Sequence, residues 1–302
     1  MKILVIGFGS IAKKHMAAMD SIESNVVWYA LRSSKAAVAI DGVKSIYDKS
    51  EIPSVDFILI SNPTSLHLEA VKWAIKLNKP LMIEKPLFHE LSEEGADLVR
   101  EISKSTIKTY IACNMRFHPI IRYLKHSLDT LDIIELNIYC GSYLPDWRPN
   151  VDYRNVYSAK KELGGGVHLD LIHEIDYVNY LLGPPEKVSS YVKKKSNLEI
   201  NSPDIAHYIM EHPNVSTFIT LNYYRRNPKR TIEVVMSQDT WTADLLKGTI
   251  TNGNDEVIFS NTLSVLTTYK SQMKHMVDVV KGNTKSLNTI EESYQTLKHC
   301  LN

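Results

Sequence analysis

An aspartate and a histidine three residues apart, Asp170 and His173, could carry acid–base chemistry in the second half of the chain. They follow three consecutive glycines, which let the backbone approach a ligand or a neighbouring element before a helix begins. At helical spacing the two side chains share a face with Tyr177, and an apolar stripe covers another face. The stripe consists of Leu171, Ile172, Ile175, Val178 and Leu182. An imidazole beside a carboxylate, away from the core, suits a general base with its orienting partner.

The same segment permits a second interpretation, because His173 with Asp170, Glu174 or Asp176 could also bind a metal ion. The sequence has no H-E-x-x-H spacing and no CxxC pair, which are the patterns typical of zinc sites. We therefore expect no zinc or iron centre. His168 projects toward the apolar side of the helix and is expected to be a packing residue.

A lysine at the end of an apolar run could stabilise negative charge on a reacting oxygen. Glu84-Lys85-Pro86 follows the run 81–83, which has the composition of a buried strand. Open α/β sheets bind ligands at the carboxyl ends of their strands. Because a proline disfavours helical geometry at the preceding residue, Lys85 is expected to be extended at this exit. A surface lysine before a proline is common. The prediction therefore rests on the position of Lys85 directly after a strand of the sheet.

A glycine pattern near the start of the chain is typical of dinucleotide binding, namely Gly7-Phe8-Gly9-Ser10-Ile11-Ala12. It follows an apolar run and opens a helical pattern. Gly7 permits a tight turn, Gly9 lets the backbone approach a pyrophosphate, and Ala12 keeps the helix close to its strand. The helix N-terminus stabilises phosphate charge, so we predict that Gly7, Phe8, Gly9, Ser10 and Ile11 bind the cofactor.

The residues after the second apolar run bear on the choice of cofactor. NAD-binding sites usually carry an acidic side chain about 20 residues on, which accepts hydrogen bonds from the ribose 2′-hydroxyl. This chain instead reads Leu31-Arg32-Ser33-Ser34-Lys35. A cation and two hydroxyls suit a 2′-phosphate, so NADP is the preferred cofactor and NAD the alternative. In the other interpretation, Arg32 and Lys35 begin a solvated helix.

Short apolar runs alternate with helical patterns over about the first 115 residues, which indicates βαβ units and a parallel sheet. The expected strands are 2–6, 25–31, 43–46, 56–60, 81–83 and 109–113, and the expected helices are 11–19, 65–77 and 92–103. Thr64 is expected to cap the second helix, which ends at Asn78 and Pro80. Ser92 precedes two glutamates, whose charge suits a first helical turn.

Strands predominate in the second half, after one helical pattern that follows Pro119. Residues 215–223 alternate with period two, as in a sheet with one polar face. Asn227-Pro228 indicates a turn, and Asn252-Gly253 indicates a hairpin between 247–251 and 256–259. Helical patterns at 267–280 and 290–301 close the chain. The boundary between the halves is expected near Phe117–Pro119.

Composition limits the class of protein. A chain of 302 residues suggests about two domains. Its 35 Lys+Arg and 34 Asp+Glu nearly balance, which argues against a nucleic-acid partner. Three widely spaced cysteines, Cys113, Cys140 and Cys300, favour the reducing cytoplasm. The first apolar run lacks a cleavage site, and no run reaches the roughly 18 residues of a membrane span, so no membrane partner is expected.

Five segments in this order resemble the Gfo/Idh/MocA family of NAD(P)-dependent oxidoreductases, which includes glucose–fructose oxidoreductase and inositol dehydrogenase. They are Gly7–Ile11 with His15, Ser61–Thr64 with His67, Glu84–Pro86, Asn114–Pro119 and Gly164–Asp176. The resemblance covers essentially the whole chain. It implies the α/β class: a Rossmann domain over 1–117 with a doubly wound parallel sheet, then an α/β domain over 118–302 with a large, mostly antiparallel open sheet. The open face of that sheet would join a homodimer or homotetramer.

The resemblance also implies roles for individual residues. The nucleotide would be lined by Asn62, Pro63, Thr64 and His67, and its nicotinamide region would be reached by Glu84 and Lys85. The catalytic set would be Lys85, Asp170 and His173. The family commonly has D-x-G-x-H, whereas this chain resembles the branch with D-L-x-H-E-x-D, in which His173 remains the implied base.

An aromatic and basic stretch precedes the glycines at 144–158 and is suited to stacking on a sugar and pairing with an acid or phosphate. Trp147, Tyr153 and Tyr157 are its candidate substrate contacts. Similar stretches occur in family members linked to glycan and sugar-nucleotide biosynthesis. Alternatively, this long loop covers the domain seam or reaches a second subunit. Arg116 is either a further substrate contact or a structural ion pair at the seam.

These residues together predict an enzyme that transfers hydride between a nicotinamide and a secondary alcohol or ketone. The expected substrate is a sugar, a cyclitol or a sugar nucleotide, with His173 as general base and Lys85 stabilising charge on the oxygen. One alternative is a non-catalytic regulator that senses the nucleotide on the same fold. Another is a reductase of a non-sugar carbonyl or imine.

Overall fold

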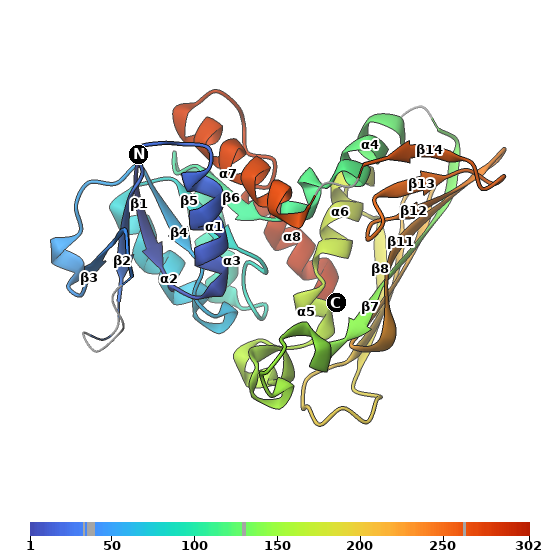
Figure 1. Ribbon diagram of the computed structural model, residues 1–302, viewed down its shortest axis with the longest axis horizontal. Helices are drawn as coiled ribbons and strands as arrows, with labels where there is room; N and C mark the ends of the chain where they lie inside the picture. Colours follow the sequence, from blue (N-terminus) through green and yellow to red (C-terminus); the bar gives the residue numbers. More distant parts are fainter. Residues whose placement is uncertain (33, 35–39, 129–130, 262–263) are drawn as a thin grey trace. The chain divides into compact units, whose positions relative to one another are not determined.

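The computed structural model describes residues 1–302 except 33, 35–39, 129–130 and 262–263. The chain divides into two compact units. Unit 1 comprises Met1–Asn114 and Val265–Leu297, drawn mainly in blue, cyan and red in Figure 1, and unit 2 comprises Met115–Ser264 and Lys298–Asn302. Each unit has its own sheet.

Unit 1 contains a six-stranded parallel sheet with the order β3-β2-β1-β4-β5-β6, which is the order of a Rossmann fold. The strands are β1 (Lys2–Ile6), β2 (Val27–Leu31), β3 (Val43–Ile46), β4 (Phe57–Ile60), β5 (Leu81–Glu84) and β6 (Thr109–Ala112). The predicted doubly wound sheet and all six of its strands are confirmed, with strand ends within two residues of those expected.

The strands of unit 1 read as continuous apolar runs because the sheet is buried on both faces. Every residue of β4 is inaccessible to solvent, and so are Leu81, Met82 and Ile83 of β5. Since all six strands are parallel, their carboxyl ends lie at one edge of the sheet. The loops that follow β1, β2, β4 and β5 therefore share that edge.

The predicted helices of the first half are present as α1 (Ser10–Asp20), α2 (His67–Ala74) and α3 (Glu93–Lys104). The Ser92 side chain caps α3 by accepting a hydrogen bond from the backbone N–H of Gly95 at 3.0 Å. The prediction that Thr64 caps α2 is wrong. Thr64 begins a short 3₁₀ turn, η2 (Thr64–Leu66), and α2 starts after it without a side-chain cap.

The end of the chain returns to unit 1. Helix α7 (Val265–Lys281) runs beside α1 (Figure 1), and Asn288, before α8 (Ile290–Leu301), accepts a hydrogen bond of 2.9 Å from the N–H of Ile111 in β6. The expected second domain covers all of 118–302, but Val265–Leu297 belongs to unit 1. Periodicity identifies the apolar face of a helix but not the surface that covers it.

Unit 2 contains an eight-stranded sheet with the order β14-β13-β12-β11-β7-β10-β9-β8. The strands are β7 (Ile133–Tyr143), β8 (Lys187–Lys193), β9 (Ile205–Glu211), β10 (Ser216–Asn222), β11 (Tyr224–Met236), β12 (Thr240–Asp244), β13 (Thr249–Thr251) and β14 (Val257–Ser260). Neighbouring strands are antiparallel except for the parallel pair β7 and β10. The large, mostly antiparallel sheet is confirmed.

Two turn predictions in unit 2 have opposite outcomes. The hairpin at Asn252-Gly253 is confirmed, since it joins β13 and β14. The turn at Asn227-Pro228 is wrong, because both residues lie inside β11, where the pairing with β7 shifts register between Tyr224 and Lys229. Proline has no N–H to give to a ladder, so it fits where the ladder is interrupted.

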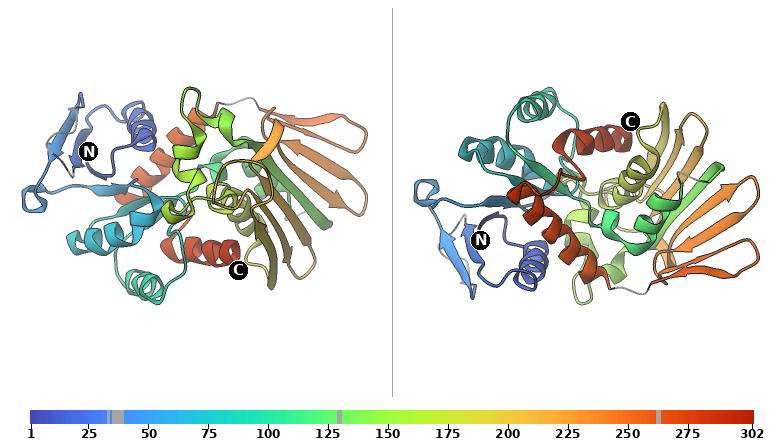
Figure 2. Two further views of the ribbon diagram at one scale, coloured as in Figure 1. Left: turned by 90° about the horizontal axis from the view of Figure 1, so that it is seen from below. Right: turned by 90° about the horizontal axis from the view of Figure 1, so that it is seen from above.

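The helices of unit 2 lie against one face of its sheet (Figures 1 and 2). They are α4 (Pro119–Ser127), α5 (Val167–Asp170) and α6 (His173–Leu182). In the described part of unit 2, the opposite face carries no helix, and Tyr191, Ile209 and Phe218 are exposed on the strands.

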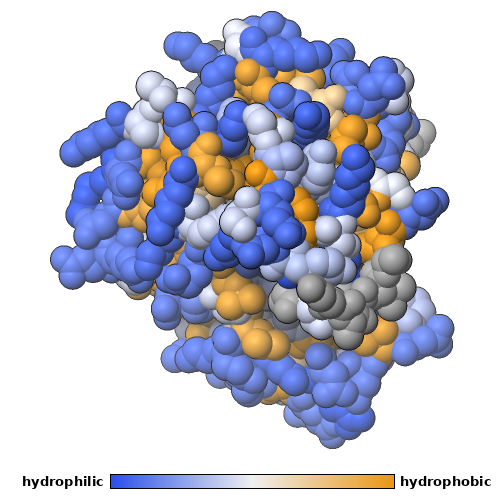
Figure 3. Space-filling view, turned by 90° about the vertical axis from the view of Figure 1, so that its left-hand side faces the viewer, coloured by the Kyte–Doolittle hydropathy of each residue, from blue (hydrophilic) through white to orange (hydrophobic). Residues whose placement is uncertain are grey.

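The surface is mixed in character. Figure 3 shows the side that carries β3, where hydrophilic residues predominate and apolar residues occur in separate groups. Exposed apolar residues of unit 1 include Ile22, Tyr47, Leu66 and Leu91. Among the described helices, none is both long enough and apolar enough to span a membrane.

Candidate active site

The glycine loop after β1 is held tightly against the loop after β4. Gly7 has a φ of 86°, and a Cβ at this position would lie 2.3 Å from the backbone of Asn62. The Ser61 hydroxyl donates a hydrogen bond of 2.8 Å to the Gly7 carbonyl. These contacts require glycine at position 7, both for its left-handed backbone and for the close approach.

The other end of the loop is open. A Cβ at Gly9 would have no described atom within 4 Å, and Gly9 precedes α1, which begins at Ser10. The first turn of α1 contains no acidic residue. Phe8 and Ile11 are half-buried, whereas Ser10 is exposed. Room beside a helix N-terminus free of carboxylates suits an anionic group.

Arg32 is the cation at the end of β2. Its backbone N–H donates to the carbonyl of Ile46 at 2.9 Å, and its side chain is half-buried. Ser33, the other residue predicted to bind a 2′-phosphate, lies outside the described residues. Ser34 is exposed.

The loop after β4 presents one unsatisfied polar atom. The Asn62 side chain donates from Nδ2 to the Leu66 carbonyl at 3.1 Å, while its Oδ1 is buried with no hydrogen-bond partner in the described part of the chain. Pro63 is exposed and Thr64 is buried. A buried acceptor of this kind usually has a partner, which a ligand can supply.

His67, predicted to line the nucleotide, is turned into the protein and is only 1% exposed. Its Nδ1 lies 3.0 Å from the Pro86 carbonyl and 3.1 Å from the Leu87 carbonyl, and its Nε2 lies 3.0 Å from the Asn62 carbonyl. Burial lowers the pKa of His67, against the opposing effects of these carbonyls and of Glu84. The ring therefore contacts the two loops rather than open space.

Strand β5 ends at Glu84, and Lys85 begins the loop that follows. Glu84 is buried and pairs with Nε2 of His15 from α1, and its Oε2 accepts a hydrogen bond of 3.2 Å from the backbone N–H of Lys85. Lys85 is half-buried and precedes Pro86 through a cis peptide bond. Within unit 1 the structure thus gathers the predicted cofactor residues at the carboxyl edge of the sheet.

In unit 2, the helix predicted to continue through Asp170 and His173 is broken. Helix α5 ends at Asp170, Leu171 and Ile172 form a turn, and α6 begins at His173. The glycines before α5 are tightly packed: a Cβ at Gly165 would lie 2.2 Å from the Tyr157 carbonyl. His173 is half-buried at the first position of α6.

Asp170 is held by tyrosines rather than facing solvent. It is 6% exposed, and the Tyr223 hydroxyl donates a hydrogen bond to its Oδ2. Burial, together with the Asp170 charge and its hydrogen bonding, raises the pKa of both Tyr223 and Tyr157 well above the usual value. Both hydroxyls therefore stay protonated and can donate to the carboxylate. Tyr223 was not among the predicted site residues, and its only signal in the sequence is that it ends the alternating stretch 215–223.

Tyr177 departs from the prediction that it shares an open face with Asp170 and His173, since it is 1% exposed and lies in the core. His168, predicted to be a packing residue, is buried, and burial lowers its pKa to about 4. No group of three or more potential metal ligands occurs among the described residues.

Two ion pairs whose carboxylates are buried fix α6. Arg116 donates to Asp176 from Nε at 2.9 Å and from Nη2 at 2.8 Å, and Arg230 of β11 donates to Glu174 at 2.7 Å. Asp176 and Glu174 are fully buried, and Arg116 is 5% exposed. Of the two interpretations of Arg116, this geometry favours the structural ion pair. The two ion pairs also explain why Glu174 and Asp176 follow His173: these acidic residues anchor α6, which begins at His173.

The aromatic stretch lies partly beside Asp170. Trp147 donates from Nε1 to the Ser142 hydroxyl at 2.8 Å and packs edge-on against Tyr223, with ring centroids 5.2 Å apart. The Arg148 guanidinium lies over the Tyr157 ring, 5.6 Å from its centroid. Tyr153 instead accepts a hydrogen bond of 3.2 Å from the N–H of Glu199. Trp147 is thus linked to Asp170 through Tyr223, and Tyr157 hydrogen-bonds Asp170 itself. Tyr153 bonds Glu199 instead.

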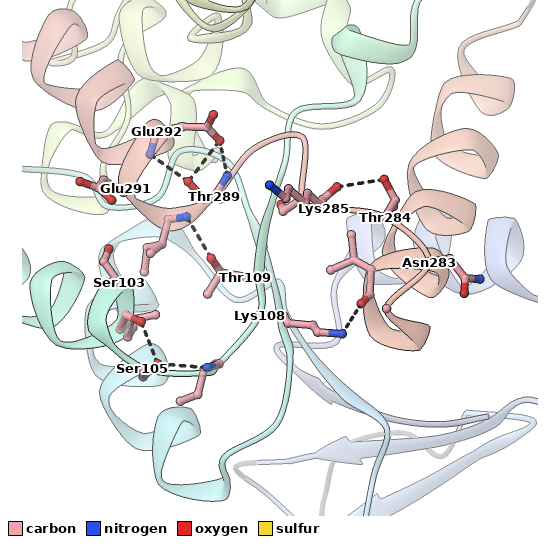
Figure 4. Close-up of a pocket in the computed structure, with 16 residues that line it drawn as sticks. Ser103, Ser105, Lys108, Thr109, Asn283, Thr284, Lys285, Thr289, Glu291 and Glu292 are labelled. Atoms are coloured by element: carbon pink, nitrogen blue, oxygen red, sulfur yellow. Dashed lines mark hydrogen bonds between the residues drawn. The ribbon is translucent and has the colours of Figure 1, made fainter.

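A separate groove of about 780 Å³ lies between α3, β6 and the start of α8 (Figure 4). Several of its polar groups form hydrogen bonds within unit 1. Lys108 donates to the Val279 carbonyl at 2.8 Å, and Glu292 accepts from the N–H of Thr289 at 2.7 Å. The groove lies at the amino end of β6, whereas the predicted cofactor loops lie at the carboxyl edge of the sheet.

Two family models match the chain. One, described as an oxidoreductase family with an NAD-binding Rossmann fold, matches residues 1–111. The other, described as the GFO/IDH/MocA C-terminal domain, matches residues 122–242.

Similar curated proteins include two inositol dehydrogenases. The chain is 26% identical over 192 residues to myo-inositol 2-dehydrogenase of Thermotoga maritima, covering 61% of this chain and 55% of that protein. It is 25% identical over 199 residues to scyllo-inositol 2-dehydrogenase (NADP(+)) IolW of Bacillus subtilis, covering 64% and 54%. The chain spans about half the length of the curated relatives it matches.

Similar solved structures span nearly the whole chain. UDP-N-acetylglucosamine 3-dehydrogenase GnnA from Acidithiobacillus ferrooxidans has a TM-score of 0.78 at 18% identity, covering 99% of this chain and 95% of that one. The WlbA dehydrogenase from Bordetella pertussis, solved with NADH and UDP-GlcNAcA, has a TM-score of 0.80 at 16% identity, covering 98% and 92%. At these identities, the likeness shows a shared fold.

Proposed function

Because the chain belongs to the Gfo/Idh/MocA family of oxidoreductases, we propose that it is an NAD(P)-dependent dehydrogenase of a secondary alcohol, able to reduce the matching ketone. The substrate class we propose is a sugar, a cyclitol or a sugar nucleotide. The match of both domain models carries this proposal. The names of the relatives agree with it, since they are dehydrogenases of inositols and of a UDP-sugar.

The loops of unit 1 suit a dinucleotide. The turn at Gly7, the room beside Gly9 and the acid-free start of α1 fit a pyrophosphate. Oδ1 of Asn62 is buried without a donor in the described part of the chain and could accept a hydrogen bond from the cofactor. When bound, the nicotinamide ring supplies a hydride acceptor at its C4 atom.

His173 is the proposed general base. A nitrogen of its half-buried ring would take the proton of the substrate hydroxyl, while the carbon that bears this hydroxyl would give up its hydride. The O–H and C–H bonds break and the C=O bond forms, so the alcohol loses two electrons and two hydrogens. In reverse, the imidazolium returns its proton to the ketone oxygen.

Lys85 and Asp170 support this step in the proposal. The Lys85 ammonium stabilises negative charge on the reacting oxygen. The Asp170 carboxylate, held by tyrosine hydroxyls, orients His173 or binds a neighbouring substrate hydroxyl. The proposed sugar contacts are Trp147, which packs against Tyr223, and Tyr157, which hydrogen-bonds Asp170.

The proposed activity is tested by following NADPH or NADH absorbance with a panel of inositols, hexoses, sugar phosphates and UDP-sugars. We expect turnover on at least one member, and its loss in Lys85→Met, because methionine keeps the length of the side chain without its charge. A Lys79→Met variant, in the loop before β5, is the matched control. Tight cofactor binding with no turnover across the panel would instead favour a nucleotide sensor.

The preference for NADP is tested at Arg32. In Arg32→Asp, the dissociation constant of NADPH is expected to rise about 10- to 100-fold, because a charge-assisted hydrogen bond to the 2′-phosphate is replaced by repulsion. The constant for NADH should change much less, since its ribose carries a hydroxyl there. Quenching of protein fluorescence measures both constants. Arg100→Asp, on the exposed surface of α3, is the control. An equal change for both cofactors would contradict the assignment of Arg32.

A further inference from the structure

The aromatic and basic stretch at 144–158 contains two arginines whose surroundings differ. Arg154 is already neutralised, because it pairs with Asp152 at 2.9 Å and with Glu199 at 2.7 Å. Arg148 is exposed, and within the described part of the chain no carboxylate forms an ion pair with it. Of the two guanidinium groups, that of Arg148 is therefore the one available to an anion from solution.

The Arg148 guanidinium is held over an aromatic ring. It lies 5.6 Å from the centroid of the half-buried Tyr157 ring, within the range of a cation–π contact. The backbone of Tyr157 is fixed in turn, since its carbonyl accepts a hydrogen bond of 2.9 Å from the N–H of Lys160 and lies tightly against Gly165. The ring therefore gives the guanidinium a defined position at the surface of unit 2.

The same ring connects this cation with the candidate active site. The Tyr157 hydroxyl hydrogen-bonds the Asp170 carboxylate, while the Arg148 guanidinium lies over the ring. Burial and the Asp170 charge raise the pKa of Tyr157, whereas the Arg148 charge opposes this rise. A positive and a negative group thus flank one tyrosine ring, whose width is comparable with that of a six-membered sugar ring.

These charges give the site a polarity. The Asp170 carboxylate accepts hydrogen bonds from hydroxyls and repels anions, whereas a guanidinium only donates and matches the geometry of carboxylates and phosphates. Lys161 adds positive charge nearby, because burial lowers the pKa of His168 and the Lys161 charge lowers it further. A sugar that carries an oxyanion would therefore place a hydroxyl at Asp170 and the oxyanion at Arg148.

We propose that Arg148 determines substrate specificity by binding an oxyanion, a phosphate or a carboxylate, on the sugar whose hydroxyl faces Asp170. The preferred substrates are then sugar phosphates, nucleotide sugars or sugar acids rather than neutral sugars and cyclitols. That the bound sugar is also oxidised rests on the proposed function, whereas the preference for charge stands on the geometry of unit 2. Arg148 takes no part in the hydride transfer and acts through affinity alone.

Binding to the complex with NADPH or NADH tests this preference without turnover, because a reduced nicotinamide cannot oxidise a secondary alcohol. Isothermal titration calorimetry on the full chain compares glucose with glucose 6-phosphate, glucuronate and UDP-glucose, and myo-inositol with its monophosphate. We expect at least one charged probe to bind about 10-fold more tightly than its neutral counterpart, as for one charge-assisted hydrogen bond. The charged probes distinguish a phosphate monoester, a carboxylate and a diphosphate.

Variants at the two arginines assign the effect. In Arg148→Gln the dissociation constant of the charged probe should rise about 10-fold, and that of the neutral probe should stay within about twofold. In Arg148→Glu the charged probe should bind more weakly than the neutral one, because repulsion replaces attraction. Added salt should narrow the preference of the wild type but not affect Arg148→Gln. Arg154→Gln is the matched control and should bind every probe as the wild type does, since Arg154 pairs with Asp152 and Glu199.

Equal affinity of the wild type for charged and neutral probes, or no measurable binding of any charged probe, would overturn the role of Arg148. An equal loss in Arg154→Gln would do the same, because general surface charge would then account for the preference. With a charged substrate that is turned over, KM should rise in Arg148→Gln while kcat stays within about twofold. If binding depends on Arg148 but neither NADP nor NAD is ever reduced, the anion site stands and the proposed dehydrogenase activity fails.

Discussion

Replacing His173 with asparagine is expected to lower turnover by about 10²- to 10⁴-fold, the usual contribution of a general base. Asparagine is close to histidine in size and polarity but cannot take a proton at neutral pH. The residue begins α6, whose following turn is fixed by the buried Glu174 and Asp176, so the helix should persist in the variant. Steady-state rates at saturating cofactor and substrate measure the effect.

Cofactor affinity separates this loss from a general disturbance. NADPH and NADH should bind His173→Asn within about twofold of the wild type, because the predicted nucleotide groups lie in unit 1 and His173 lies in unit 2. His207→Asn is the matched control, since His207 is a half-buried histidine of unit 2 on β9 that contacts Thr220 at 3.1 Å. Turnover that survives in His173→Asn would remove this residue from the mechanism.

Replacing Arg116 with methionine is expected to cost about 3–5 kcal/mol of the free energy of unfolding of unit 2. The change leaves the Asp176 carboxylate, which is fully buried, without the two hydrogen bonds that compensate its charge. It also removes the guanidinium that lies over the Tyr180 ring, 5.0 Å from the centroid. Urea unfolding followed by circular dichroism measures the loss.

An exposed arginine provides the comparison for Arg116. Arg154 bonds Asp152 and Glu199 at the surface, where solvent screens the charges, so Arg154→Met should leave the free energy of unfolding nearly unchanged. The double change of Arg116→Met with Asp176→Leu should recover much of the stability, because the uncompensated charge is gone. If Arg116→Met is as stable as Arg154→Met but raises KM for the substrate, Arg116 is a substrate contact after all.

The Rossmann unit was readable from sequence because its strands depend on local pattern. Buried parallel strands form unbroken apolar runs, and the glycines at 7 and 9 mark the turn that follows the first of them. The same holds for the alternating strand at 216–222 and for the Asn252-Gly253 hairpin. In each, the residues that determine the structure are neighbours in the chain.

Other features depend on partners far away in the chain. Helical periodicity continues across Leu171 and Ile172, yet the helix breaks there, between packed glycines on one side and buried ion pairs on the other. The 3₁₀ turn at Thr64 places His67 within hydrogen-bonding distance of the carbonyls of Pro86 and Leu87, which come 19 and 20 residues later in the chain. Neither arrangement has a signal within one helical turn of sequence.

The candidate site divides in the same way. The residue types of Lys85, Asp170 and His173 were evident, but the burial of Asp170 was not, because Tyr223 lies 53 residues further on. Arg116 could be assigned only once Asp176, 60 residues away, was found beside it. Sequence thus indicated which groups could react, and packing showed that Arg116 and Asp176 bond each other.

The return of the chain end to unit 1 has a consequence for synthesis on the ribosome. Strand β6 is at the edge of the parallel sheet, and its Ile111 N–H is satisfied by Asn288, which emerges 177 residues later. Until then a nascent chain presents an open strand edge and the uncovered surface of α1 that α7 will occupy. Fragments that stop before α7 should therefore be prone to self-association, and a fusion or split of this protein has to keep Val265–Leu297 with the first 114 residues.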